Sequence, residues 1–175
     1  WVLWGVAGSR RWGEAVAGGV GRRGDAVGHY GDVLGTYLVK LSARHLSTED
    51  TRTINTLLHT IGDFERVSDH AVNLIKTAEE IRDKSIQFSE EALGDLGVLE
   101  AAVQDIVNRT VDAFQKGDVY AAGKIEPLEQ VVDGLVREVK TRHIARLQAG
   151  VCTIEYGLVL DDLLAHSARH AAHCS

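Results

Sequence analysis

The feature that most constrains the fold is a helical spacing of apolar residues, which runs from about residue 29 to the end of the chain. The chain has 175 residues, a single proline and 45% hydrophobic residues, with few aromatic side chains. This composition favours an all-α fold, and the length suits one globular domain or two small bundles that share an interface. Helices are expected over residues 24–46, 50–83, 89–116, 118–149 and 153–175, and residues 1–23 show no clear periodicity.

Polar residues and glycines mark where the expected helices begin and end. Ser47 and Ser89 each precede acidic residues, which is the pattern of an N-cap with an acidic first turn. Gly117 and Gly150 stand where the third and fourth helices end. Pro127 lies inside the fourth helical pattern, so that helix either kinks there or begins near it.

Charge and cysteine usage exclude several classes of protein. The net charge is −6 and the basic residues form no clustered face, so a general nucleic-acid binder is not expected. No apolar run approaches the roughly 20 residues of a transmembrane helix. Cys152 and Cys174 lack CxxC spacing and cannot form a disulfide framework, which favours a reducing cytoplasm.

Catalytic motifs are not found in the sequence. It contains no GxSxG elbow, no HExxH motif and no P-loop lysine motif. We therefore do not expect an enzyme. The chain starts with Trp1 and contains no methionine, so we expect a fragment of a longer protein.

The glycines of "GGVGRRGDAVGHYGDVLGTYL", residues 18–38, satisfy the letters of a GxGxxG phosphate-binding turn. Such a turn needs a preceding strand and an acidic residue at the end of a second strand, and neither is evident. We interpret the stretch as a frayed helix instead, in which each glycine costs about 1 kcal/mol relative to alanine. The glycines at one-turn spacing are Gly24, Gly28, Gly31 and Gly35.

An internal repeat gives the most information about domain organisation. The pattern "DFERVSDHAVN" at 63–73 returns as "HSARHAAHCS" at 166–175, with His173 standing 103 residues after His70. At a similar offset of 105, residues 23–30 lie against 128–135. Two copies of a helical unit therefore fill the chain. Since helix 89–116 opens the second copy, its counterpart in the first copy is missing or lies in the irregular start.

Two helices carry an ExxxD pair at the edge of the apolar stripe: Glu65 with Asp69, and Glu129 with Asp133. Two hard oxygen ligands one turn apart can converge on one cation. The alternative is an acid at the boundary of the core that is solvated or salt-bridged, but the recurrence of the pair favours a metal site. Three residues of the second expected helix should point away from the apolar stripe: Asp63, Arg66 and His70.

A second candidate metal site is the stripe of Asp162, His166, His170 and His173, whose spacing allows zinc or nickel binding. The stripe lies opposite to the face expected in the core, so a solvated surface is the competing interpretation. The remaining histidines considered are expected at the surface or the boundary of the core: His45, His59 and His143.

Three segments carry a resemblance to a known family. "LLHTIGDFERVSDHAVNLIKTAEEI", residues 57–81, resembles the signature helix of the PhoU family. "LGTYLVKLSARHLS" at 34–47 and "IEPLEQVVDGLVREVKTRHIARLQAG" at 125–150 resemble the PhoU-like domain at the C-terminus of Na/Pi cotransporter family proteins. The resemblance covers the chain from about residue 24 to the end.

The resemblance implies an all-α fold of two PhoU-type three-helix bundle repeats, the first with an irregular or incomplete first helix. Residues 1–23 would be poorly structured or a partial first helix, 24–86 the first repeat, and 87–175 a second repeat that is truncated at its C-terminus.

The resemblance further implies that each bundle holds a transition-metal ion, iron or zinc, between ExxxD motifs on two helices. Glu65, Asp69, Glu129 and Asp133 match these motifs. The partner positions hold residues that cannot ligate: Gly24, Gly28, Ala168 and Ala172. Because two carboxylates leave most of a cation's shell to water, we expect metal binding to be weak or absent.

In function, the resemblance implies a regulatory or interaction domain for phosphate uptake, at the inner face of the plasma membrane. It would be the cytoplasmic C-terminal part of a sodium-dependent phosphate cotransporter, with the membrane transporter domain as its partner in cis or in trans and a homodimer as one option. Two alternatives stay open: a stand-alone PhoU-type negative regulator of phosphate transport, and a metal-binding helical protein of unrelated role that uses the His166 stripe.

Overall fold

The computed structural model describes residues 14–175, with side chains from residue 18, and this part of the chain consists of helices joined by loops, without strands. The helices are α2 (Glu14–Ser42), α3 (Thr48–Asp83), α4 (Glu90–Lys116), the single turn α5 (Val119–Ala122), α6 (Ile125–Gln148) and α7 (Ile154–Ala172). The predicted all-α class is confirmed. Within the same residues, no helix has the length and apolar character needed to cross a membrane.

The helix ends follow the local signals in the sequence. Ser47 Oγ accepts the Asp50 N–H at 3.1 Å while the Asp50 carboxylate accepts the Ser47 N–H at 3.2 Å, which forms a capping box. Ser89 Oγ likewise accepts the N–H of Ala92, and Gly117 ends α4 with a φ of 62°. Both predicted N-caps are therefore confirmed. Pro127 lies in the first turn of α6, where its missing N–H breaks no helical hydrogen bond.

The first helix begins earlier than predicted. α2 starts at Glu14, ten residues before the predicted start at position 24. Residues 1–23 were predicted to be poorly structured or a partial first helix, and residues 14–23 are helical. Residues 1–13 lie outside the described part of the chain. The GxGxxG letters fall inside α2, whose backbone N–H groups are engaged in the helix, so the stretch forms no phosphate-binding turn.

Two of the α2 glycines, Gly24 and Gly31, pack against α3. A Cβ placed on Gly24 would lie 3.0 Å from Val72 Cγ2, and one placed on Gly31 would collide with the Glu65 carboxylate. The two helices approach this closely because the glycines have no side chains. Tertiary packing therefore offsets the low helix propensity of the stretch, and the helix continues through it.

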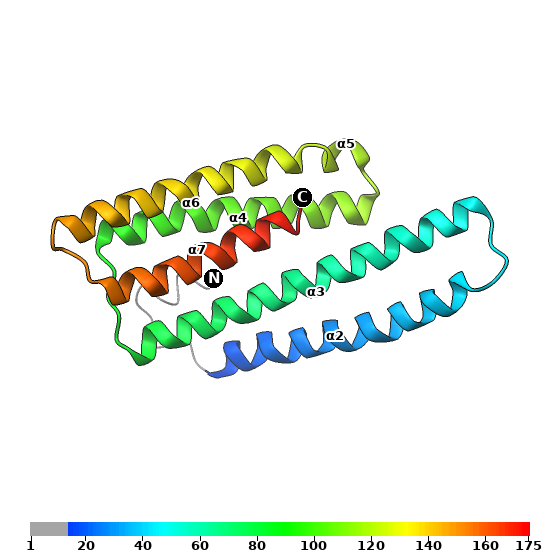
Figure 1. Cartoon of the computed structure of the whole chain (residues 1–175), viewed down its shortest axis with the longest axis horizontal. Helices are drawn as coiled ribbons and strands as arrows, with labels where there is room; N and C mark the ends of the chain where they lie inside the picture. The colour runs from blue at the N-terminus through cyan, green and yellow to red at the C-terminus, as the bar shows by residue number, and fades with distance from the viewer. Residues whose placement is uncertain (1–13) are drawn as a thin grey trace.

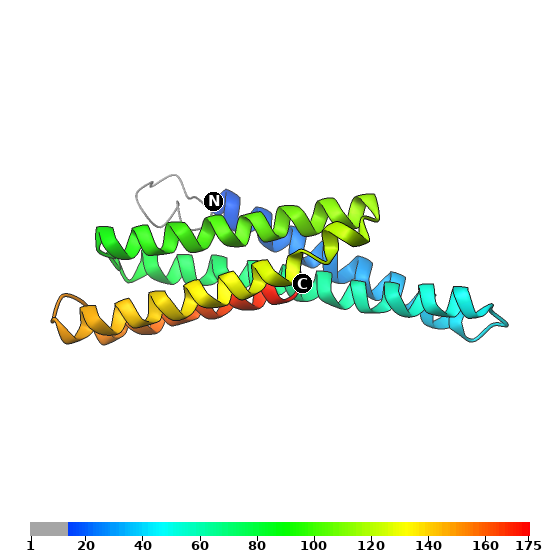
Figure 2. The ribbon, with the colours of Figure 1, turned by 90° about the horizontal axis from the view of Figure 1, so that it is seen from above.

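Helices α4, α6 and α7 pack together as a three-helix unit, and α3 packs along α7, which joins the α2–α3 hairpin to that unit (Figure 1). Seen from above, the loop end of the hairpin extends away from the other helices (Figure 2). The core lies mainly in the α4–α6–α7 unit, where each fully buried aliphatic side chain contributes about 1.5–3 kcal/mol. Its most buried large residues are Leu96, Leu99, Ile106, Val132, Val159, Leu160, Leu163 and Leu164.

Candidate functional site

Histidines gather where α3 packs against α7. His70 Nδ1 lies 3.3 Å from His166 Nδ1, and the His70 ring stacks on His173 with centroids 5.6 Å apart and 12° between the ring planes. His173 Nδ1 lies 3.5 Å from Asp63 Oδ1. Asp63 and His70 were predicted to point away from the apolar stripe of this helix, and the side of α3 that carries them contacts α7. α3 has a second contact face, and α7 covers it.

The contacts at this seam are related by the internal repeat. Position 63 of the first copy corresponds to 166 of the second, and 70 corresponds to 173, each 103 residues later. Exchanging the copies turns the contact between Asp63 and His173 into the contact between His166 and His70, and the structure contains both. His70 and His173 exchange with each other. This is the contact pattern of a two-fold axis, here within one chain.

His170 completes the histidine cluster, which consists of His70, His166, His170 and His173. Its Nδ1 is buried without a hydrogen-bond partner within the described part of the protein. Burial lowers the pKa of His170, and the nearby imidazoles of His70 and His173 lower it further.

The pKa values of two more imidazoles in the cluster are also lowered. For His70 the largest cause is burial, followed by the charges of His166, His173 and Arg169, while Asp69 opposes them. For His166 burial again acts first and Arg169 second, while Asp162 raises its pKa. The surroundings therefore favour the neutral form of His70, His166 and His170.

The predicted stripe on α7 is brought together only in part. His166, His170 and His173 lie at the seam, whereas Asp162 is exposed. Across residues 14–175, no three side chains of the His, Cys, Asp and Glu types lie close enough to hold a metal ion. As they are placed, these residues do not fit a zinc or nickel site.

The two ExxxD pairs lie on different helices and stay apart from each other. Glu65 is half-buried against Gly31 of α2, while Asp69 on the next turn is exposed. Glu129 and Asp133 are both half-buried on α6. Neither pair gains a third carboxylate, imidazole or thiolate within the described residues. The side chains therefore do not fit a metal cluster, and the metal site stays a prediction.

The predicted partner positions divide between buried and open surroundings. Gly24 faces Ser68 and Val72, whereas a Cβ on Gly28 would contact nothing within 4 Å. Ala168 packs against the core and Ala172 is exposed. The glycine that faces a predicted ligand is Gly31, opposite Glu65. The expected pairing of Gly24 and Gly28 with that site is therefore out of register.

His143, which was predicted to lie at the surface or at the boundary of the core, is buried. Its Nδ1 lies 3.7 Å from Cys152 Sγ, and its ring packs against Gly157 of α7. Burial lowers the pKa of His143, and the positive charge of Arg146 adds to the effect. The signal for this contact was the glycine at 157, because a missing Cβ leaves room for an imidazole. His45 and His59 are exposed, as predicted.

Sequence reasoning also missed an ion pair that is largely buried between α4 and α6. The carboxylate of Asp95 accepts hydrogen bonds from Arg146 Nη1 at 3.0 Å and from Arg142 Nη1 at 2.8 Å. The side chains of Asp95 and Arg146 are 9% and 12% exposed. Two arginines one turn apart on α6, opposite an acid within the apolar spacing of α4, were the available signal.

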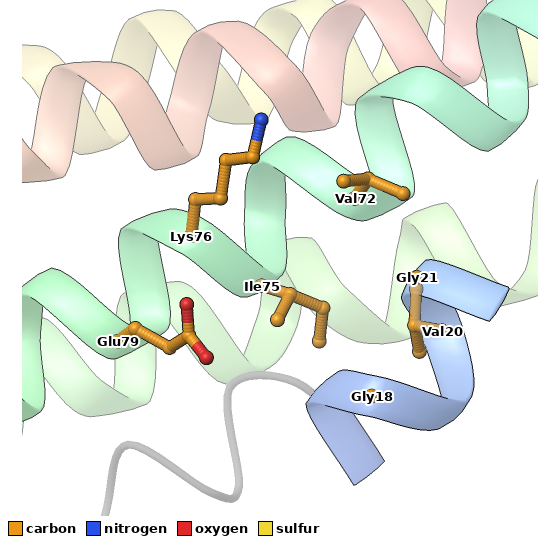
Figure 3. A pocket seen from close by; sticks show the side chains of 7 residues that line it. All are labelled: Gly18, Val20, Gly21, Val72, Ile75, Lys76 and Glu79. Atoms are coloured by element: carbon orange, nitrogen blue, oxygen red, sulfur yellow. The ribbon is translucent and has the colours of Figure 1, made fainter. Parts of the chain in front are cut away.

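A pocket lies between the start of α2 and α3 (Figure 3). Glycines 18 and 21 leave space there, and the charged side chains in the lining are Lys76 and Glu79, of opposite sign. This lining supplies no set of convergent positive groups for a phosphate. The full lining is Gly18, Val20, Gly21, Val72, Ile75, Lys76 and Glu79.

Comparisons with protein-family models, with curated proteins and with solved structures found no match to this chain. The functional interpretation therefore depends on the sequence pattern and on the contacts described above. The most informative of these contacts are those between Asp63 and His173 and between His70 and His166 at the α3–α7 interface.

Proposed function

We propose that this chain is a PhoU-like regulatory and interaction domain in phosphate uptake, the cytoplasmic C-terminal part of a sodium-dependent phosphate cotransporter family protein. Its fold would consist of two PhoU-type repeats, with α4, α6 and α7 as the second three-helix bundle. The α2–α3 hairpin would be the first repeat without its first helix. The resemblance of residues 34–86 and 125–164 to that domain supports the proposal.

One structural observation carries the proposal, namely the exchange of contacts at the α3–α7 seam. The contacts between Asp63 and His173 and between His70 and His166 correspond to each other under the repeat. A duplicated helical unit that packs against its own copy produces this pattern. Such an arrangement supports the two-bundle architecture that the resemblance implies.

We propose regulation rather than catalysis because the polar side chains between α3 and α7 contact one another across the two helices. The described pocket between α2 and α3 is lined by glycines, apolar side chains and two charges of opposite sign, and the histidine cluster lies elsewhere. A domain of this kind acts by binding a partner. The proposed partner is the membrane transporter domain, in cis or in trans.

Phosphate uptake in the source organism tests the proposal. Cells carrying the intact gene are compared with cells in which the coding region for residues 14–175 is deleted. The expected result is that uptake no longer falls when external phosphate is abundant. The exposed substitution His59→Gln serves as a control and should leave the response unchanged. An unaltered response after the deletion would overturn the proposal.

The same cells separate the two transport-related alternatives. The segment is returned either fused to its native upstream sequence or as a separate polypeptide. Rescue by the fused form alone supports a cotransporter domain, whereas rescue by the separate polypeptide supports a stand-alone negative regulator. The third alternative is a metal-binding protein of unrelated role. If it holds, zinc titration of the purified chain shows binding, and His170→Leu removes that binding.

A further inference from the structure

One side of the α2–α3 hairpin exposes a continuous set of large hydrophobic side chains. Helical geometry of about 100° per residue places those of α2 on one flank, beside the glycine surface that packs on α3. Those of α3 lie on the same side of the hairpin. The members of this apolar face are Tyr30, Val33, Leu34, Tyr37, Leu57 and Phe64, which are between 41% and 65% exposed.

Under the internal repeat, the α2–α3 hairpin corresponds to the hairpin of α6 and α7, and two residues there that correspond to members of the apolar face are buried. Continuing the two offsets places Leu34 over Val139 of α6, and Leu57 over Leu160 of α7. Val139 and Leu160 are 3% and 1% exposed, and both belong to the core. The same position is therefore buried in one hairpin and exposed in the other.

In the second copy, helix α4 packs on α6 and α7 and covers this face. Tyr37 corresponds to Arg142, whose guanidinium bonds Asp95 of α4. In the first copy, α2 packs on α3 alone among the described helices, and both views show the hairpin extending past α4 (Figures 1 and 2). The apolar face adjoins an existing interface at one end, where the rings of Phe64 and Phe114 of α4 meet edge to face at 5.6 Å.

The direction of the covering helix follows from α4. Asp95, near the start of α4, bonds arginines near the end of α6, and Thr110, near the end of α4, donates to the carbonyl of Cys174 just after α7. α4 is therefore antiparallel to α6 and parallel to α7. An equivalent helix on the first copy would run antiparallel to α2 and parallel to α3.

We propose that the apolar face binds a single amphipathic helix of a partner protein, lying on α2 and α3 as α4 lies on α6 and α7. A single helix is the occupant, rather than a second copy of the hairpin, because one helix covers the repeat-related face. The inference rests on the two-repeat arrangement proposed above and does not depend on a role in phosphate uptake.

The kind of side chain expected on the partner helix follows from the residues that differ between α6 and α2. Where α6 presents Arg142 and Arg146 to Asp95, α2 presents Tyr37 and Leu41. An acid on the partner helix at that place would be buried without a cation, which is costly. The partner helix is therefore apolar at the position that Asp95 occupies in α4, with apolar residues at three- and four-residue spacing.

A labelled peptide tests the proposal against the full chain. The probe has the α4 sequence, residues 90–116, with Asp95→Leu, and binding is followed by fluorescence anisotropy. We expect saturable binding of one peptide per chain. Tyr37→Glu or Leu57→Glu should lower the affinity for the peptide by about tenfold or more. The peptide that keeps Asp95 should also bind about tenfold more weakly. This peptide also shows whether the probe binds by displacing α4 from α6. In that case the peptide with Asp95 would bind more tightly, because Arg142 and Arg146 of α6 pair with the acid.

The matched control is Thr36→Glu, which places the same charge on the opposite, exposed flank of α2 and should leave binding unchanged. Helical circular dichroism and the melting temperature show that each variant is folded, since the substituted side chains are exposed. Three results would overturn the proposal: no saturable binding, equal binding by the Tyr37→Glu variant, or a wild-type dimer in sedimentation that Tyr37→Glu dissociates. Peptide binding does not report phosphate uptake, so this proposal and the transport role can fail separately.

Discussion

His70 of α3 and His173 of α7 stack on each other with ring centroids 5.6 Å apart, and they occupy the same position in the two copies of the internal repeat. The contacts around them are those that a two-fold axis between the two copies would produce. A substitution at either residue acts on the interface between α3 and α7. The stability of this seam should consequently depend on how many of its imidazoles carry a proton.

The first prediction is that acid weakens the fold. The folded chain lowers the pKa values of His70, His166 and His170 below their ordinary value of 6.5, mainly through burial. The unfolded chain takes up these protons near pH 6.5 and therefore binds more protons below it. Stability is then fully present above about pH 6.5 and is lost as pH falls toward the lowered pKa values. Urea unfolding midpoints at pH 7.5 and 5.5 measure the loss.

Substitutions separate the histidine cluster from general acid effects. His170→Leu removes the most buried imidazole of the cluster and should make the midpoint less sensitive to pH. His59→Gln removes an exposed histidine outside the cluster and should leave the pH dependence as it was. A midpoint that falls equally in wild type and in His170→Leu would contradict the assignment.

The second prediction concerns two glycines of α2 that differ only in their surroundings. A Cβ on Gly28 would meet nothing within 4 Å, so Gly28→Ala should raise the free energy of unfolding by up to about 1 kcal/mol through helix propensity. A Cβ on Gly31 would collide with the carboxylate of Glu65. Gly31→Ala should therefore raise the free energy of unfolding by less than Gly28→Ala does, because the side chain of Glu65 must move.

A double variant shows whether the collision is the cause. In a Glu65→Ala background the collision is removed, and Gly31→Ala should then match Gly28→Ala, as measured by urea denaturation. Equal effects of the two glycine substitutions in the wild-type background would show that α2 and α3 do not approach as closely as described.

The third prediction concerns the ion pair between α4 and α6. Asp95→Ala leaves Arg146 largely buried without its carboxylate, and the loss of one partner of a buried pair costs about 3–5 kcal/mol. Arg142→Ala removes an exposed partner of the same acid and should cost less than about 1 kcal/mol. Urea denaturation of both variants makes the comparison. Similar costs would mean that Asp95 is solvated in solution.

Helix ends could be predicted from the sequence because their signals act on their own segment. Ser47, Ser89 and Gly117 each determine the local backbone, and each lies where predicted. The start of α2 at Glu14 could not be predicted in the same way. Glycines indicate a weak helix by propensity alone, and the packing of Gly24 and Gly31 against α3 offsets that weakness.

The candidate site was predicted less well, because one apolar stripe was assumed for each helix. α3 contacts α2 on one face and α7 on another, and the second face carries polar residues such as Asp63 and His70. The burial of His143 was not predicted for a related reason, since it depends on the glycine at 157 across the hairpin. Such pairings depend on the register between distant segments, which a single sequence does not specify.

The final prediction concerns the metal sites implied by the family resemblance. Chain purified without chelator should contain less than one iron or zinc ion per molecule, because Glu129 and Asp133 have no third ligand of carboxylate, imidazole or thiolate type within the described residues. The packing of His143 against Gly157 sets the antiparallel register of α6 and α7. Continued along both helices, this register brings the ExxxD pair beside Ala168 and Ala172.

Ala168→Glu combined with Ala172→Asp should therefore create a four-carboxylate site and raise the metal content toward one ion per chain, as measured by elemental analysis. Ala101→Glu with Ala145→Asp adds the same charge at exposed positions and should not change the metal content. One equivalent of metal in the unmodified chain would contradict the prediction. If His170→Leu then removed that metal, the ligands would be the histidine cluster rather than the carboxylates, since Glu129 and Asp133 are unaltered in that variant.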